Sequence, residues 1–325
     1  MTGKIGVFLP GRYGDIMQGM SVLKYKDILW PDKDVVWFCN DDFNDVLKHN
    51  DAISEIRNWP HGWGLLQRCE EENRKLKPGE PLWADMRRLK DANNHLRQDL
   101  KHELELTKDL EQGYFPAPWM VETPAQRSGV DYPNFSRRVF GVNPAWEWHP
   151  YLCFSDEERE AVKEFCSRLP HKKTIAIETD TSNRLSLDDS LIQETMAICR
   201  QKLGKCNFIF VCASDSSKFF DDPGVVSCSQ FTVRQTALVN NYSDLFIGVS
   251  SGLSQAVNCW GNKPTPKLQY CGSFTGSSVS IANGPIELVV TDPPGSWPEH
   301  ERKYPASRKH REVYKERLSS ILDKL

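Results

Sequence analysis

Residues 242–256 read YSDLFIGVSSGLSQA and decide the fold of this chain. Leu245 to Val249 is an apolar run of strand length, and it leads into a small-residue turn at 250–252. Helical spacing begins at once, at Leu253, and extends to Trp260. A buried strand that passes directly into a helix is typical of a βα unit. The stretch therefore predicts a parallel sheet with helices on both faces.

The same alternation continues on both sides of this unit. Ser155 followed by three acids is typical of a helix start, and we expect that helix to reach Arg168, before Pro170. Beyond it, the pattern predicts helices at 190–203 and 232–242 and strands at 174–178, 207–212, 266–270 and 286–290. The final segment, 310–325, has the spacing of an amphipathic helix, and one position open to it is against the first half of the chain.

The first half of the chain alternates in the same way. The pattern predicts strands at 4–9, 35–39 and 53–59 and helices at 15–29 and 43–49. Residues 65–110 are highly charged and predict a helical insertion, either solvated helices or a segment that shapes an acceptor pocket. Proline and aromatic residues crowd 116–150, so we expect a domain boundary near Pro150. We therefore predict two Rossmann-like, doubly wound α/β domains, 1–150 and 151–325, facing a central cleft.

Composition disfavours several classes of protein. The 325 residues carry a formal net charge of −3 and the pI is near 6.3, so no field that would gather nucleic acid is expected. No apolar run is long enough to span a bilayer, and the first lacks the features of a secretory signal. Ten cysteines occur without a Cys-x-x-Cys pair, which indicates buried thiols in a cytoplasmic protein. Peripheral membrane contact through Trp119, Trp146 and Trp148 stays open, although such aromatics more often pack at a domain junction.

The loop after the first predicted strand carries a candidate catalytic group. It contains Gly11, Arg12, Tyr13, Gly14 and Asp15, and the glycines allow a tight turn between strand and helix. Asp15 stands at the start of the helix, where it either caps the helix or acts as a general base at the rim of the cleft. The glycine spacing does not reproduce Gly-x-Gly-x-x-Gly, which disfavours a dinucleotide site.

Two loops of the second half offer contacts for a phosphate. Residues 179–186 hold Thr179, Thr181 and Arg184, which form either a diphosphate site or an ordinary polar turn. The turn at 250–252 opens a helix, whose N-terminal N–H groups bind phosphate or are merely capped by serine. The candidate residues of this second loop are Ser250, Ser251, Gly252, Leu253, Ser254 and Gln255.

Three segments carry a resemblance to a known family. The run 234–256, the Gly-Asn-Lys-Pro at 261–264 and the Gly-Asp-Ile at 14–16 resemble motifs of glycosyltransferase family 9, the heptosyltransferase-like enzymes of GT-B architecture. The resemblance implies that Asp15 is the catalytic base and that Arg184 stands about where the family has a phosphate-binding lysine. It also implies that the second domain binds the nucleotide sugar and the first domain the acceptor. Ser250 and Gln255 depart from the family pattern, which usually has an acid and a histidine there, so the donor sugar is open.

These observations together predict a metal-independent, inverting glycosyltransferase of glycan biosynthesis. Its co-substrate is a nucleoside diphosphate sugar, either hexosyl or heptosyl, its acceptor is an oligosaccharide or a glycolipid, and no cofactor is expected. The Asp-x-Asp triplet at 32–34 precedes a strand, so we interpret it as a turn and not a metal site. Alternatives are a non-catalytic nucleotide-sugar or glycan-binding protein, a Rossmann-type oxidoreductase or epimerase, and a transferase of a neighbouring GT-B family.

Overall fold

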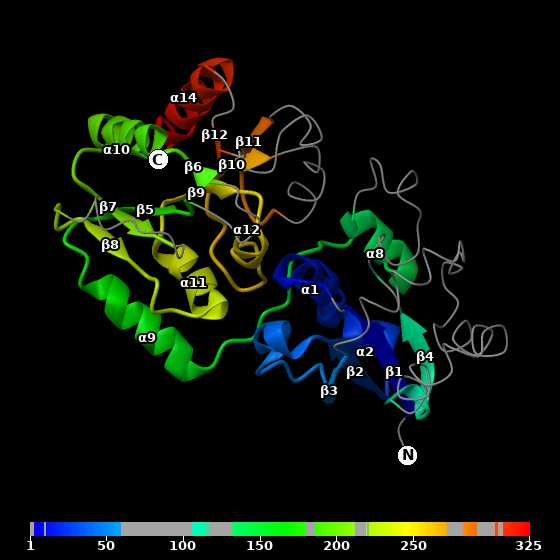
Figure 1. Ribbon diagram of the computed structural model, residues 1–325. Coiled ribbons are helices and arrows are strands. Elements are labelled where there is room, and N and C mark those ends of the chain that lie inside the picture. The colour runs from blue at the N-terminus through cyan, green and yellow to red at the C-terminus, as the bar shows by residue number, and fades with distance from the viewer. Residues whose placement is uncertain are drawn as a thin grey trace, which may run out of the picture. The chain divides into compact units, whose positions relative to one another are not determined.

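The computed structural model in Figure 1 divides into two compact units, Met1–Cys153 and Phe154–Leu325. We describe each unit by itself. The structure describes residues 3–9, 11–59, 106–114, 116, 132–179, 186–211, 219, 221–271, 282–290, 303–304 and 308–325. Most of the predicted insertion at 65–110 lies outside these residues. Among the described helices, none combines the length and the apolarity needed to cross a bilayer.

The first unit is built on a parallel sheet. Its described strands are β1 (Gly3–Phe8), β2 (Lys33–Cys39), β3 (Glu55–Asn58) and β4 (Leu110–Tyr114), in the spatial order β3-β2-β1-β4. The helical elements are α1 (Tyr13–Met20), η1 (Ser21–Tyr25), α2 (Lys26–Leu29), η2 (Asp41–Leu47) and α8 (Tyr132–Phe140). The predicted helix at 15–29 is thus three short helical elements in succession. The predicted charged helical insertion ends in a strand, because the segment from Leu110 pairs with β1.

The second unit holds a larger parallel sheet. Its described strands have the order β11-β10-β9-β5-β7-β8, and a separate pair joins β12 to β6. The strands are β5 (Lys173–Ile177), β6 (Ser186–Leu187), β7 (Cys206–Phe210), β8 (Val225–Ser227), β9 (Leu245–Val249), β10 (Lys267–Cys271), β11 (Ile286–Val290) and β12 (Lys303–Tyr304). The helical elements are α9 (Asp156–Ser167), α10 (Asp189–Leu203), α11 (Val233–Val239), η5 (Asn240–Tyr242), α12 (Gly252–Ala256) and α14 (Arg308–Leu322).

Helices cover both faces of this second sheet, as predicted. In Figure 1, α10 and α14 lie on one side of it and α9 and α11 on the other. Side chains alternate along the strands, so Ile175 and Ile177 join the core beneath α10 and α14, while Ala176 joins the core beneath α9 and α11. The near-continuous apolar strands of this half are therefore explained by burial on both faces.

Local signals correctly predicted the start of α9 and placed the end of α12 too late. Ser155 caps α9: its Oγ accepts the Glu158 N–H, and its own N–H donates to the Glu158 carboxylate. The helix α12 ends at Ala256, well before the predicted Trp260, and the chain continues with tighter bonds from Asn258 N to Gln255 O and from Cys259 N to Ala256 O.

The final helix, α14, packs its apolar side into the core of the second unit, where Tyr314, Leu318, Ile321 and Leu322 are buried. It contacts α10 and β11 of the same unit. A further contact of this helix with the first half of the chain stays a prediction.

Candidate functional site

Sheet topology marks one point in each unit where a ligand is expected. In an open parallel sheet, ligands bind beyond the carboxyl ends of the strands, where the strand order reverses. In the first unit this switch point lies between β1 and β4, and in the second it lies between β5 and β9. The loop that holds Asp15 follows β1, and the loop that begins at Ser250 follows β9. Two of the predicted loops thus lie at the switch points of their own sheets.

In the first unit, Asp15 is held close to the end of β1. It is the third residue of α1, it is half-buried, and its Oδ2 accepts the backbone N–H of Arg12 at 3.1 Å. The predicted capping role is therefore present. A carboxylate has about four lone-pair sites, so this bond is compatible with a second role as a proton acceptor.

Gly11 is packed directly against this carboxylate. A Cβ atom at Gly11 would lie 2.3 Å from Oδ2 and 2.6 Å from Cβ of Asp15, closer than real Cβ atoms approach. Gly11 is buried and Asp15 is half-buried, so a side chain at Gly11 would have to displace the carboxylate. The position of the Asp15 side chain therefore depends on the absence of a side chain at Gly11.

The remaining candidates of this loop differ in exposure. Arg12 is exposed, whereas Tyr13 and Gly14 are half-buried. The Tyr13 ring meets Phe43 edge-on, with 5.1 Å between ring centroids. Burial, and then the nearby Asp45, raise the pKa of the Tyr13 hydroxyl, so it stays a neutral phenol over the physiological range. Tyr13 can therefore serve as a wall and a hydrogen-bonding group but not as a base.

In the second unit, the two serines at the start of α12 cap each other. Ser251 Oγ accepts the Ser254 N–H at 2.9 Å, and Ser254 Oγ accepts the Ser251 N–H at 2.9 Å. The Ser250 N–H donates to the carbonyl of Tyr270 at 2.9 Å. The serine-cap interpretation is thus realised. Among the described residues, the N–H groups of Gly252 and Leu253 have no acceptor, which leaves two donors at this helix start.

Glu178 is a member of this site that sequence reasoning missed as a functional group. Its side chain is buried, and the Ser251 hydroxyl donates to its Oε1 at 2.5 Å. A Cβ atom at Gly248 would lie 2.9 Å from its Oε2, so the glycine of β9 makes room for the carboxylate. The available signal was an acid directly after an apolar strand, at the same sheet edge as Ser250. Glu178 places a buried carboxyl group behind the predicted phosphate loop and accepts a hydrogen bond from the hydroxyl of Ser251.

Two further candidates, Thr179 and Gln255, are also buried. Thr179 directly follows Glu178 in the sequence, and Gln255 directly follows Ser254. Gln255 is 5% exposed, and its Oε1 has no hydrogen-bond partner among the described residues. Thr179 is buried, and its carbonyl accepts the Leu187 N–H at 2.7 Å. The other two predicted phosphate contacts, Thr181 and Arg184, lie outside the described residues. Within the described ranges, no group of three His, Cys, Asp or Glu side chains is arranged to hold a metal ion.

No protein-family model matches the sequence, and no curated protein matches it significantly. Solved structures do match. The ADP-heptose LPS heptosyltransferase II of E. coli is 11% identical, with a TM-score of 0.60 and 99% of each chain covered. The E. coli heptosyltransferase WaaC, solved with ADP, is 12% identical, with a TM-score of 0.55 and coverage of 98% of this chain and 99% of that one. A family 9 glycosyl transferase from Veillonella parvula is 15% identical, with a TM-score of 0.60 and coverage of 89% and 86%.

These similarities establish the fold. The chain has the mixed α/β fold of the family 9 glycosyltransferases, with parallel sheets in both units, so the predicted GT-B class is confirmed. The resemblance seen in residues 14–16 and 234–264 is confirmed at this level.

Proposed function

We propose that the chain is a glycosyltransferase that moves a sugar from a nucleoside diphosphate sugar to a hydroxyl group of a glycan. The observation that carries the proposal is the fold, shared over almost the whole length with two heptosyltransferases, one of which was solved with ADP. The polar loops at the two switch points support it, because they put an acid in one unit and backbone donors in the other.

Asp15 is the proposed general base. As the acceptor hydroxyl attacks the anomeric carbon, its proton passes to the Asp15 carboxylate, and the bond from the anomeric carbon to the diphosphate oxygen breaks. Attack from the face opposite the leaving group inverts the anomeric centre. The Arg12 N–H and the close contact with Gly11 hold the carboxylate in one orientation, which favours a fixed distance to the acceptor.

The second unit is proposed to bind the donor. Its polar contacts to the diphosphate would come from the N–H groups of Gly252 and Leu253, which have no acceptor among the described residues, and from Thr179, Thr181, Arg184, Ser250, Ser254 and Gln255. The Ser251 hydroxyl is already bonded to Glu178, so among these groups the positive charge for the diphosphate would come from Arg184. We propose that Arg184 supplies the charge stabilisation that a metal ion gives in other transferases and that no cofactor is required. A cytoplasmic location belongs to the same proposal, and the eight described cysteines, all thiols and most of them buried, support it.

One observation favours a second candidate, a non-catalytic nucleotide-sugar or glycan-binding protein. Ser250 and Gln255 are neutral, and the hydroxyl of Ser251 is engaged by Glu178. A loop whose side chains are neutral and bonded within the protein can bind a ligand but has no group that transfers a proton.

A donor screen separates the two candidates. Thermal unfolding would be followed with ADP-, GDP-, UDP- and dTDP-linked sugars for the wild type, for Arg184→Ala and for the exposed control Arg168→Ala. A transferase predicts stabilisation by one nucleotide class, weakened in Arg184→Ala only, together with release of the nucleoside diphosphate when an acceptor is supplied. Stabilisation without release under any acceptor would favour the binding protein. No stabilisation by any saturating donor would overturn the donor site itself.

A further inference from the structure

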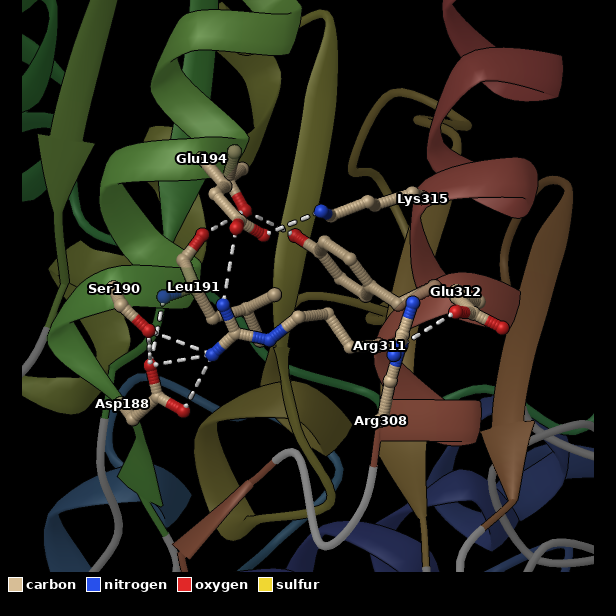
Figure 2. A network of polar contacts seen from close by, with 10 residues as sticks. Asp188, Ser190, Leu191, Glu194, Arg308, Arg311, Glu312 and Lys315 are labelled. Carbon is tan, nitrogen blue, oxygen red and sulfur yellow. Dashed lines mark hydrogen bonds and ion pairs between the residues drawn. The ribbon is translucent and has the colours of Figure 1, made fainter.

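The C-terminal helix, α14, contacts the start of α10 through a cluster of ion pairs and hydrogen bonds (Figure 2). From α14, Arg311 Nη2 donates to Asp188 Oδ2 at 3.0 Å and to Ser190 Oγ at 2.6 Å, while its Nη1 donates to Glu194 Oε1 at 3.0 Å. Lys315 reaches the other oxygen of Glu194 at 3.0 Å. The Arg311 side chain is only 24% exposed, so one planar guanidinium holds two acids and a hydroxyl in a partly desolvated place.

The group that Arg311 holds is the cap of α10. Asp188 Oδ1 accepts the Leu191 N–H at 2.7 Å and the Ser190 hydroxyl at 2.6 Å. Burial opposes ionisation of Asp188, yet the bonds from Ser190 and Leu191 and the charge of Arg311 lower its pKa overall. Asp188 is therefore a carboxylate at neutral pH, and its position is fixed from both sides.

The cap connects directly to the edge of the sheet where the donor site is proposed. Leu187, the preceding residue, lies in β6, which pairs with β12, and its N–H donates to the carbonyl of Thr179 at 2.7 Å. Thr179 follows Glu178, whose N–H donates to Ile247 of β9 at 2.8 Å. The bond between Thr179 and Leu187 thus closes the stem through which the chain leaves β5 and returns to α10.

A second contact joins the same helix to the other strand end of the site. Tyr314 stacks on Tyr270 of β10, with 5.2 Å between ring centroids, and its hydroxyl is 2.7 Å from the Thr195 hydroxyl on α10. The carbonyl of Tyr270 is the acceptor for the Ser250 N–H. One helix therefore supports both the stem at Thr179 and the turn at Ser250.

We propose that Arg311 is a positioning residue for the nucleotide-sugar site. By holding Asp188, it fixes the stem formed by Thr179 and Leu187 before the donor arrives, so less conformational entropy is lost when the donor binds. The inference rests on the proposed function, since it assigns Arg311 an effect on donor affinity. It gives Arg311 no contact with the donor.

Three variants test this inference. Arg311→Met keeps an unbranched apolar stem and removes the charged guanidinium group. Asp188→Asn keeps a good cap for α10 but loses the charge that faces Arg311. Arg308→Met is the matched control, because Arg308 lies one turn earlier on α14, has a side chain that is 93% exposed, and pairs with Glu312 on the same helix. For each protein, affinity for ADP, GDP, UDP and dTDP would be measured by calorimetry, and exchange of the Leu187 amide by hydrogen exchange.

The inference predicts that Arg311→Met binds the nucleotide that the wild type prefers about tenfold more weakly than the wild type does. A tenfold change is the size of a modest coupling between two sites. The Leu187 amide should exchange faster, the amides of β7 and β9 should keep their protection, and Arg308→Met should match the wild type. The combined variant Arg311→Met with Asp188→Asn should lose less than the sum of the two single losses. If Arg311→Met does not fold, Asp188→Asn decides: weaker binding supports the inference and unchanged binding overturns it.

Two failures are distinguishable. A wild type that binds none of the four nucleotides contradicts the proposed function. A wild type that binds one of them with the same affinity as folded Arg311→Met contradicts the positioning role alone.

Discussion

Asp15 shows how one side chain serves local structure and proposed chemistry together. It completes the first turn of α1 by accepting the Arg12 N–H, which is the role that sequence spacing favours for an acid at a helix start. The contact with Gly11 was not predictable in the same way, because it depends on how the turn folds back on the carboxylate. The identity of the residue is a sequence property, whereas its orientation is a property of the folded turn.

Gly11→Ala tests this orientation. The added methyl group must push the Asp15 carboxylate aside, so we expect turnover to fall roughly tenfold to a hundredfold, with a smaller change in donor affinity. Steady-state kinetics and a nucleotide titration would measure the two effects. If Gly11 acts through Asp15, Gly11→Ala combined with Asp15→Asn should be no slower than Asp15→Asn alone. Full additivity of the two losses would contradict that role.

Lys267 makes the free energy of unfolding depend on pH. It is fully buried in β10, its Nζ donates to the carbonyls of Thr265 and Asn283 at 2.8 and 2.5 Å, and it forms no ion pair with an acid among the described residues. Burial lowers the pKa of Lys267 from its ordinary value of 10.5 to about 8. Between these two values the unfolded chain binds more protons than the folded one, so this lysine makes stability rise with pH.

The prediction is a difference between two proteins. From pH 8 to 10.5, the free energy of unfolding of the wild type should gain on that of Lys267→Met by up to about 3 kcal/mol. Buried cysteines such as Cys199, whose thiol pKa burial raises to about 12, act in the opposite direction, but they are common to both proteins and cancel. Urea unfolding at several pH values would measure the difference. If the free energies of unfolding of the two proteins changed in parallel with pH, the pKa of Lys267 would not be lowered in the folded protein.

At the scale of elements, strong periodic signals were predictable and contacts between distant segments were not. The strand 245–249 and the capped start of α9 were correctly predicted, and the strands 174–178 and 207–212 overlap β5 and β7, because each carries its own pattern. The pair of β6 with β12 escaped prediction, since each strand has two residues and the pairing joins segments over a hundred residues apart. The contact of Glu178 with Ser251 escaped for the same reason.

The junction of α9 and α11 gives a prediction at this scale. Arg234 is 2% exposed and binds Glu158 through two bonds, of 2.7 and 2.6 Å. Removing one partner leaves a buried charge, so Arg234→Met or Glu158→Gln should lower the free energy of unfolding by about 3 to 5 kcal/mol. Arg168→Ala, which breaks the exposed pair with Glu164 on α9, should cost under about 1 kcal/mol. Chemical denaturation measures both, and equal costs would contradict the buried character of the first pair.

For the whole molecule, topology explains why two of the polar loops that the sequence singles out lie at the switch points of their sheets. Both sheets reverse their strand order next to their first strand, and the loops after β1, β5 and β9 gather at those points. An alternation of strands and helices is enough to predict such loops, and the motifs at 14–16 and 250–252 identify the polar ones. The roles of Ser250 to Gln255 were less predictable, because capping within the loop decides which donors stay available to a ligand.

The central claim is that Asp15 is the base of a glycosyl transfer, and the most direct measurement is nucleoside diphosphate release by the wild type, Asp15→Asn and the exposed control Asp27→Asn. With the donor and acceptor selected by the screen, we predict that Asp15→Asn loses about 100-fold or more in kcat while it keeps its nucleotide affinity and its unfolding temperature, and that Asp27→Asn matches the wild type. Release by Asp15→Asn at the rate of the wild type would contradict the claim.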